Sequence, residues 1–158
     1  MMKKTSDISD KLHPNVDYLE PIYHSYGAKT DFFGKIYTVK CFEDNSVVRE
    51  VLNTEGHGQV LVVDAGGSKR CAMLGDILAA KALENHWAGV VMYGLIRDSE
   101  IINQMPIGVR ALGTHPLKSV KKGLGEKQVE VSFSGVVFRP GEYLYADQDG
   151  VIVIKEPI

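Results

Sequence analysis

Two uninterrupted apolar runs, residues 59–64 (QVLVVD) and 88–93 (AGVVMY), constrain the fold of this chain more than any other feature. Such runs are typical of strands that are buried on both faces of a sheet. A glycine-rich loop at 65–69 follows the first run, and residues 71–86 then show the apolar spacing of a helix. The apolar residues at this spacing are Leu74, Ile77, Leu78, Ala82 and Leu83. The pattern predicts a strand–helix–strand unit with parallel strands, because a helical crossover returns the chain to the same edge of the sheet.

Short helices and strands are expected in the rest of the chain. The predicted helices cover 6–12 (with Thr5 or Ser6 as N-cap), 46–53 and 99–103, and further strands cover 35–42 and 109–115. Prolines and a glycine make residues 13–30 irregular. From Gln128 onward the segments VEVSF, GVVF, EYLYAD and GVIVI favour strands. We therefore predict one α/β domain over residues 1–158, with a βαβ core and a β-rich C-terminal third.

Charge and composition argue against several classes of protein. The formal net charge is −2 with both signs interspersed, so we do not expect the basic face of a nucleic-acid-binding protein. The N-terminus lacks an apolar signal segment, and no apolar run reaches the length of a membrane span. Cys41 and Cys71 form no CxxC pair and are expected to be reduced, buried thiols. We expect a cytoplasmic protein that contacts neither nucleic acid nor a membrane.

Three polar residues are expected to meet at the carboxyl edge of the parallel strands, where open α/β sheets bind ligands. Asp76 lies near the start of the predicted helix, and Arg97 and Asp98 follow the second strand. The two aspartates offer the hard oxygen ligands that suit Mg²⁺ or Mn²⁺. Arg97 offers a planar fork of donors to an oxyanion or a carboxylate.

The first turn of the predicted helix adds a site for a carboxylate. The amides of Gly75, Asp76, Ile77 and Leu78 would lack partners there, and the helix dipole adds positive potential. These groups together could hold a small 2-oxo acid that chelates a metal. Taken singly, each has a simpler interpretation: Arg97–Asp98 as a solvated turn, and Asp76 as a favourable charge in a helix. His57, His86 and His115 share no metal-ligand spacing and are expected to be structural or exposed.

Several segments resemble the family of the regulator of ribonuclease activity A, which includes 4-hydroxy-4-methyl-2-oxoglutarate aldolases. They are VLVVDAGGSKRCAMLGDILAAKAL, GVVMYGLIRD, PGEYLYADQDGVIVI, EPIYHSYG and YTVKCFEDN. The resemblance covers nearly the whole chain. The aldolase members carry an aspartate, twenty intervening residues and then Arg-Asp, which here correspond to Asp76, Arg97 and Asp98.

The resemblance implies a class II pyruvate aldolase with the swivelling β/β/α fold. In that family the metal ligand would be Asp98, Asp76 would contact a water ligand of the metal, and Arg97 would reach the C2 oxygen of the substrate. The amides of 75–78 would hold the pyruvyl carboxylate. A homotrimer with sites between subunits is implied, and in longer members a neighbour's C-terminal glutamate completes the metal shell. Glu156 is the only late candidate for that role in this chain.

The implied reaction cleaves 4-hydroxy-4-methyl-2-oxoglutarate into two pyruvates, and the same enolate would arise when oxaloacetate loses CO₂. An inhibitor that binds ribonuclease E is the first alternative, because regulator-type members need only a surface. A methyltransferase is the second, because VLVVDAGGS superficially resembles a loop that binds S-adenosylmethionine. That loop lacks the spaced GxGxG pattern, so Gly66 and Gly67 are better interpreted as a turn.

Overall fold

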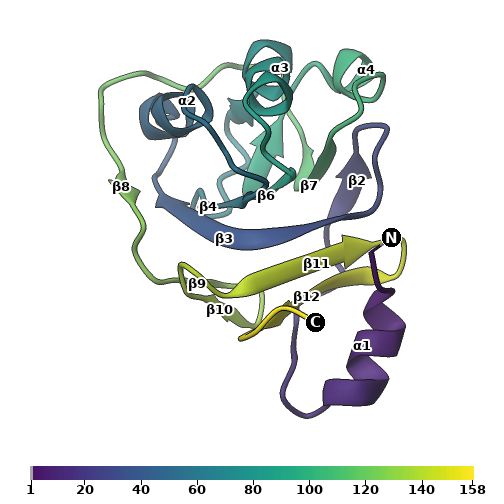
Figure 1. Ribbon diagram of the computed structural model, residues 1–158. Coiled ribbons are helices and arrows are strands. Elements are labelled where there is room, and N and C mark those ends of the chain that lie inside the picture. The colour runs from purple at the N-terminus through teal and green to yellow at the C-terminus, as the bar shows by residue number, and fades with distance from the viewer. Residues whose placement is uncertain (1) are drawn as a thin grey trace.

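The two apolar runs lie side by side at the centre of one ten-stranded sheet, in a computed structural model that describes residues 2–158. β4 (Val60–Asp64) pairs with β6 (Gly89–Ile96) in parallel, with Val62 opposite Val91, which confirms the predicted βαβ unit. The order along the sheet is β1-β12-β11-β3-β4-β6-β7-β2, while β5 pairs with β6 and β8 pairs with β3. The α/β class and the swivelling β/β/α architecture are confirmed (Figure 1).

The bounds of the remaining elements are as follows. The helices are α1 (Thr5–Leu12), α2 (Ser46–Leu52), α3 (Asp76–Glu84) and α4 (Ser99–Ile102). The strands are β1 (Asp17–Tyr18), β2 (His24–Tyr26), β3 (Phe32–Lys40), β5 (Ala72–Leu74), β7 (Gly108–Thr114), β8 (Glu126–Lys127), β9 (Val131–Phe133), β10 (Val136–Phe138), β11 (Tyr143–Asp147) and β12 (Gly150–Ile154).

Successive residues of the central strands are buried in opposite layers, as a strand covered on both faces requires. Leu61 and Val63 of β4 belong to the cluster that includes side chains of α2 and α3. Val60 and Val62 point the other way and pack in the cluster that contains Leu144 of β11. Figure 1 shows α2, α3 and α4 together on one side of the parallel strands, with β9–β12 and α1 away from them. Packing on both faces therefore fixes the parallel strands, and with them the position of the carboxyl edge of the sheet.

The predicted helix at 71–86 was wrong at its start. Residues 72–74 form strand β5, which is fully buried and pairs in parallel with the end of β6. Gly75 is extended (φ −122°, ψ −170°), and α3 begins only at Asp76. Strand pairing outweighed the helical apolar spacing here, because β6 extends past the end of β4 and its backbone groups there pair with residues 72–74. β6 also continues to Ile96, so Arg97 follows the strand directly.

The N-terminal segment also differs from its prediction. α1 begins at Thr5 after Lys4, and no side chain caps it. Thr5 instead donates from its amide and its hydroxyl to the carboxylate of Asp147, at 2.8 and 2.7 Å. Residues 13–30, expected to be irregular, contain the short strands β1 and β2, which pair with β12 and β7. Their partners lie more than 80 residues away, beyond the reach of local sequence patterns.

No helix among residues 2–158 combines the length and the apolar character of a membrane span.

Candidate functional site

Asp76 and Asp98 meet at the carboxyl edge of β6, where the βαβ topology places them. The amide of Asp76 donates a hydrogen bond to Oδ2 of Asp98 at 3.0 Å. Nε of Arg97 lies 4.0 Å from the same oxygen. Gly75 allows this approach, because a Cβ at that position would lie 2.8 Å from Asp98 Oδ2. The structure therefore brings the three predicted side chains together.

Asp98 has a left-handed backbone conformation, with φ 57° and ψ 36°. Aspartate tolerates this region better than most residues do, and non-glycine residues in it are found disproportionately at functional sites. The turn directs the chain from β6 into the short helix α4, whose Ile102 amide donates to the carbonyl of Asp98. The carboxylate can thereby face the start of α3.

The carboxylate of Asp98 is held in its charged form. Its pKa lies below the usual range, because the Asp76 amide donates to it and the Arg97 guanidinium lies beside it. Arg97 is partly exposed, and its Nη1 makes one long hydrogen bond of 3.3 Å to the carbonyl of Pro116. Most donors of the Arg97 guanidinium are therefore free for a ligand.

The start of α3 offers fewer free amides than expected, because the Asp76 amide already has Asp98 as its partner. The first intrahelical bond is donated by Ala79 to the carbonyl of Gly75, at 3.0 Å. The amides of Ile77 and Leu78 come before it and have no partner within the helix. These two groups are the ones that an incoming carboxylate can use.

A cavity of about 270 Å³ lies over these groups. The lining residues that the sequence predicted, here called the near wall, are Gly75, Asp76, Ile77, Leu78, Arg97 and Asp98. The polar and charged lining residues that the sequence did not predict, here called the far wall, are Asn45, Arg49, Lys118, Ser119 and Lys121. They come from the start of α2 and from the segment after β7. No spacing rule connects these segments to Asp76, because only tertiary folding brings them together.

Two far-wall side chains carry buried polar atoms without partners. Asn45 is 7% exposed and Ser119 is 4% exposed. Asn45 Nδ2 donates to the carbonyl of Met73 at 3.2 Å, whereas Asn45 Oδ1 and Ser119 Oγ have no protein partner. A buried polar atom without a partner is costly, so atoms of this kind that line a cavity suit a polar ligand.

The donor set fits a partly hydrated hard cation. Among residues 2–158, no group of three or more His, Cys, Asp or Glu side chains is placed to hold a metal. Asp98 and Asp76 supply two carboxylates, and Mg²⁺ commonly uses one or two carboxylates with waters and substrate as the remaining ligands. A closed zinc site would need more protein ligands than this edge offers.

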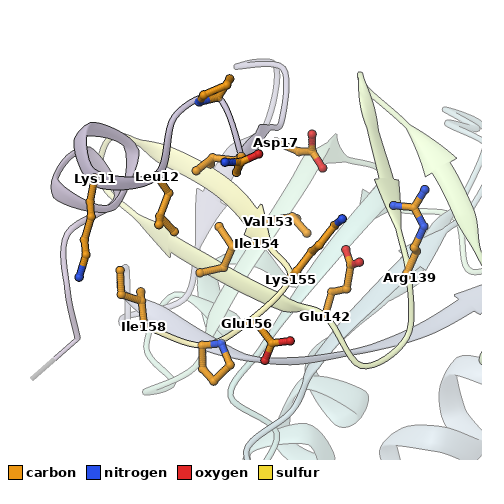
Figure 2. A pocket seen from close by; sticks show the side chains of 14 residues that line it. Lys11, Leu12, Asp17, Arg139, Glu142, Val153, Ile154, Lys155, Glu156 and Ile158 are labelled. Atoms are coloured by element: carbon orange, nitrogen blue, oxygen red, sulfur yellow. The ribbon is translucent and has the colours of Figure 1, made fainter.

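Glu156, the late carboxylate candidate, does not line this cavity. It lines a larger one of about 570 Å³ between the C-terminal tail and the end of α1, where Figure 2 shows it below Lys155 and Glu142. That cavity contains none of the three residues Asp76, Arg97 and Asp98. Within one chain Glu156 therefore lines a different cavity from Asp98.

The glycine pair after β4 is a packed turn. Both glycines have positive φ, and a Cβ on Gly66 would lie 2.6 Å from the Phe42 ring. A Cβ on Gly67 would lie 2.9 Å from Tyr93. Aromatic side chains therefore pack directly against both glycines. This arrangement favours the interpretation as a turn over a loop that binds S-adenosylmethionine.

Comparisons with known proteins show a consistent family and varied functional descriptions. The RraA-like family model, described as Aldolase/RraA, matches residues 5–153. A relative from Dechloromonas aromatica (strain RCB), provisionally named 4-hydroxy-4-methyl-2-oxoglutarate aldolase, is 56% identical over 157 residues, covering 97% of this chain and 96% of the relative.

Two solved structures are similar over almost the full chain. One is described as an S-adenosylmethionine: 2-dimethylmenaquinone methyltransferase from Geobacillus kaustophilus HTA426, with 48% identity, a TM-score of 0.95, and coverage of 99% of this chain and 97% of that one. The other is described as the RNA-processing inhibitor RraA from Thermus thermophilis, with 46% identity, a TM-score of 0.96, and coverage of 100% and 96%. Because these descriptions differ, the choice among them depends on the residues of the site.

Proposed function

This chain belongs to the RraA-like family, and on that premise we propose that it is a cytoplasmic, metal-dependent pyruvate aldolase that cleaves 4-hydroxy-4-methyl-2-oxoglutarate into two pyruvates. The observation that carries the proposal is the contact of the Asp76 amide with the Asp98 carboxylate beside Arg97. An inhibitor needs only a surface, whereas this edge gathers charged groups and free amides around one small cavity.

Asp98, with Asp76 beside it, would hold Mg²⁺ or Mn²⁺. The bound metal would act as a Lewis acid toward the C2 carbonyl of the substrate. The lowered pKa of Asp98 supports this role, because a carboxylate must be ionised to bind a cation.

Arg97 and the start of α3 would bind the pyruvyl end of the substrate. The amides of Ile77 and Leu78 would donate to its carboxylate. Arg97 would exchange its long contact with Pro116 for the C2 oxygen, where negative charge develops as the C3–C4 bond breaks. Donors fixed at the site of developing charge stabilise the transition state more than the ground state.

The carboxylate of Asp76 would accept the proton of the C4 hydroxyl, directly or through a water molecule. As that proton leaves, C4 becomes the carbonyl carbon of the first pyruvate, and the electron pair of the C3–C4 bond forms the enolate. Return of the proton to C3 completes the second pyruvate. The cleavage therefore needs no further reactant.

The far wall would bind the second carboxylate of the substrate. Ser119 Oγ is a buried hydroxyl without a partner, and Arg49 and Lys121 add positive charge beside it. A small dianion that spans the cavity would then meet donors at both ends. Asn45 Oδ1, an acceptor without a partner, suits a hydroxyl of the ligand.

The decisive experiment measures pyruvate release from 4-hydroxy-4-methyl-2-oxoglutarate and from oxaloacetate, with and without Mg²⁺ or Mn²⁺. We propose that both substrates react, because loss of CO₂ from oxaloacetate generates the same enolate. Release from neither substrate would reject the aldolase proposal. Pyruvate release from 4-hydroxy-4-methyl-2-oxoglutarate but not from oxaloacetate would reject only the decarboxylase activity.

Binding to ribonuclease E is the second candidate function, which the similarity to the structure described as an RNA-processing inhibitor favours. An aldolase and an inhibitor need different surfaces, so one protein can have both properties. A pull-down with purified ribonuclease E, run beside the aldolase assay, separates the two.

We propose further that the chain forms a homotrimer whose subunits complete each site. Ile77 on the cavity wall is 73% exposed, and Leu117, Val120 and Leu124 beside the cavity are 57%, 50% and 64% exposed. Exposed aliphatic side chains grouped in this way suit burial against another subunit. A neighbour would also exclude water from the open cavity and so strengthen its electrostatic interactions.

A further inference from the structure

The segment 117–124, here called the strap, supplies much of the far wall without being a helix or a strand. It runs past α2 between β7 and β8 (Figure 1). Ser119 is its only buried residue. At its start, the amide of Ala72 donates to the carbonyl of Leu117 at 2.7 Å. An exposed segment of this kind keeps a fixed shape only where such bonds hold it.

Asp44 holds the other end of the strap. Its side chain is buried, with 2% of the residue exposed. Oδ2 accepts hydrogen bonds from the amides of Lys122 and Leu124, at 2.8 and 3.2 Å. Oδ1 accepts from the amide and the hydroxyl of Ser46, at 2.9 and 2.6 Å. One carboxylate thus joins the start of α2 to the strap.

Neighbouring bonds reinforce this attachment. The amide of Gly123 donates to Ser46 Oγ at 2.9 Å, and the same hydroxyl donates to Asp44 Oδ1, so Ser46 links Gly123 to Asp44. The amide of Val120 donates to the carbonyl of Glu43, and the carbonyl of Val120 accepts from the amide of Asn45. Asn45 is itself a far-wall residue. The backbone around Asp44 therefore sets the positions of two parts of the cavity wall together.

We propose that Asp44 is a positioning residue of the site: it fastens the strap to α2 so that Ser119, Lys121 and Asn45 stand at the distal end of the cavity. The role rests on the proposed aldolase function. Asp44 lies one residue before Asn45 and does not line the cavity, so it acts only through the residues it holds. Only an ionised carboxylate suits the place, because all four of its contacts are donors.

Asp44→Asn tests the role with almost no change of shape. The amide must turn its NH₂ group either to the Ser46 amide or to the strap amides, so at least one hydrogen bond is lost in each orientation, and the bonds that remain are weaker because their acceptor is neutral. We expect KM for 4-hydroxy-4-methyl-2-oxoglutarate to rise about tenfold or more. The inhibition constant of pyruvate should stay within about twofold, because in the proposed binding mode pyruvate contacts only the near wall, and Asp44 does not hold that wall. The amides of Lys122 and Leu124 should exchange hydrogen faster.

Asp147→Asn is the matched control. Asp147 is also buried and accepts several hydrogen bonds, but it holds α1 to β11 and lies outside the cavity. The Asp147→Asn variant should have a lower free energy of unfolding than the parental chain, but the same ratio of KM to the pyruvate inhibition constant. If Asp44→Asn does not fold, Ser46→Ala removes the acceptor of the Gly123 amide and leaves the carboxylate in place. The Ser46→Ala variant should raise the ratio of KM to the pyruvate inhibition constant, as Asp44→Asn is expected to do.

The outcomes separate this role from the proposed function. An active parental chain whose Asp44→Asn and Ser46→Ala variants keep the parental ratio would overturn the role of Asp44 alone. A ratio that rises equally in Asp147→Asn would overturn it too, because the effect would then reflect general destabilisation. A parental chain that neither cleaves these substrates nor binds pyruvate would overturn the proposed function, and this role with it.

Discussion

The amide of Asp76 donates a 3.0 Å hydrogen bond to the carboxylate of Asp98, across 22 positions of the chain. The bond joins the first residue of α3 to the residue that follows Arg97 at the end of β6. It brings the positive end of a helix, two carboxylates and a guanidinium to one point.

Removal of divalent metal should abolish pyruvate release. Two aspartates without a nearby His or Cys ligand bind a hard cation modestly and reversibly, so an excess of chelator should strip it. Addition of Mg²⁺ or Mn²⁺ should restore the rate, and circular dichroism should show an unchanged fold throughout. Full activity in excess chelator would contradict the class II mechanism and point to a Schiff-base lysine.

Arg97→Lys should lower kcat about a hundredfold or more, the scale of losing one oxyanion donor. Lysine keeps the positive charge but loses the planar fork that can contact Asp98 and the C2 oxygen together. Steady-state kinetics on both substrates would check this. Near-parental kcat values on both would mean that Arg97 does not contact the reacting oxygen.

Gly75→Ala should impair activity while leaving the fold intact. The new Cβ would lie 2.8 Å from Asp98 Oδ2 and must push that carboxylate away, although the backbone conformation suits alanine. We expect kcat/KM to fall about tenfold to a hundredfold. Gly113→Ala in β7 is the control, since its Cβ would meet only Leu95 at an ordinary 3.5 Å. Equal losses in the two variants would argue against a specific role for the Gly75 contact.

Acid should weaken the attachment of the strap at an unusually low pH. Burial by itself would raise the pKa of Asp44, but the four hydrogen bonds that its carboxylate accepts outweigh burial and lower the pKa to about 2, against about 3.9 in an unfolded chain. Because the folded-state pKa is depressed, the stabilisation is fully present above pH ~4 and is lost as the pH falls through ~2. Denaturant unfolding at a series of pH values should show a shallower loss in this window for Asp44→Asn than for the parental chain. Identical pH slopes would show that Asp44 titrates normally.

Sedimentation equilibrium should report about three times the 17.4 kDa chain mass, as closed threefold symmetry requires. Mixing Arg97→Ala protein with protein altered on the facing surface should restore some activity if the subunits share sites. A fully active monomer would contradict the shared site and leave the assignments of Arg97 and Asp98 unchanged.

The sequence alone was sufficient for the centre of the fold and the near wall of the site. The apolar runs at 59–64 and 88–93 identify buried strands, because a strand that is covered on both faces needs apolar residues at successive positions, and this pattern can be seen within the run itself. The handedness and direction of a helical crossover are general, so they place Asp76 beside Arg97 and Asp98 without any knowledge of packing. The class of chemistry followed from those three side chains and from the family resemblance.

Only the tertiary structure decided the exact start of α3 and the far wall. Leu74 fits the helical apolar spacing of the residues after it, yet the free end of β6 offered hydrogen-bond partners to residues 72–74, and they form β5. Asn45 and Ser119 belong to segments with no shared periodicity, and they face one cavity because the buried carboxylate of Asp44 joins those segments. Local patterns report which face of an element is buried. They do not report which distant segments meet there, because that depends on the packing and hydrogen bonding of the whole chain.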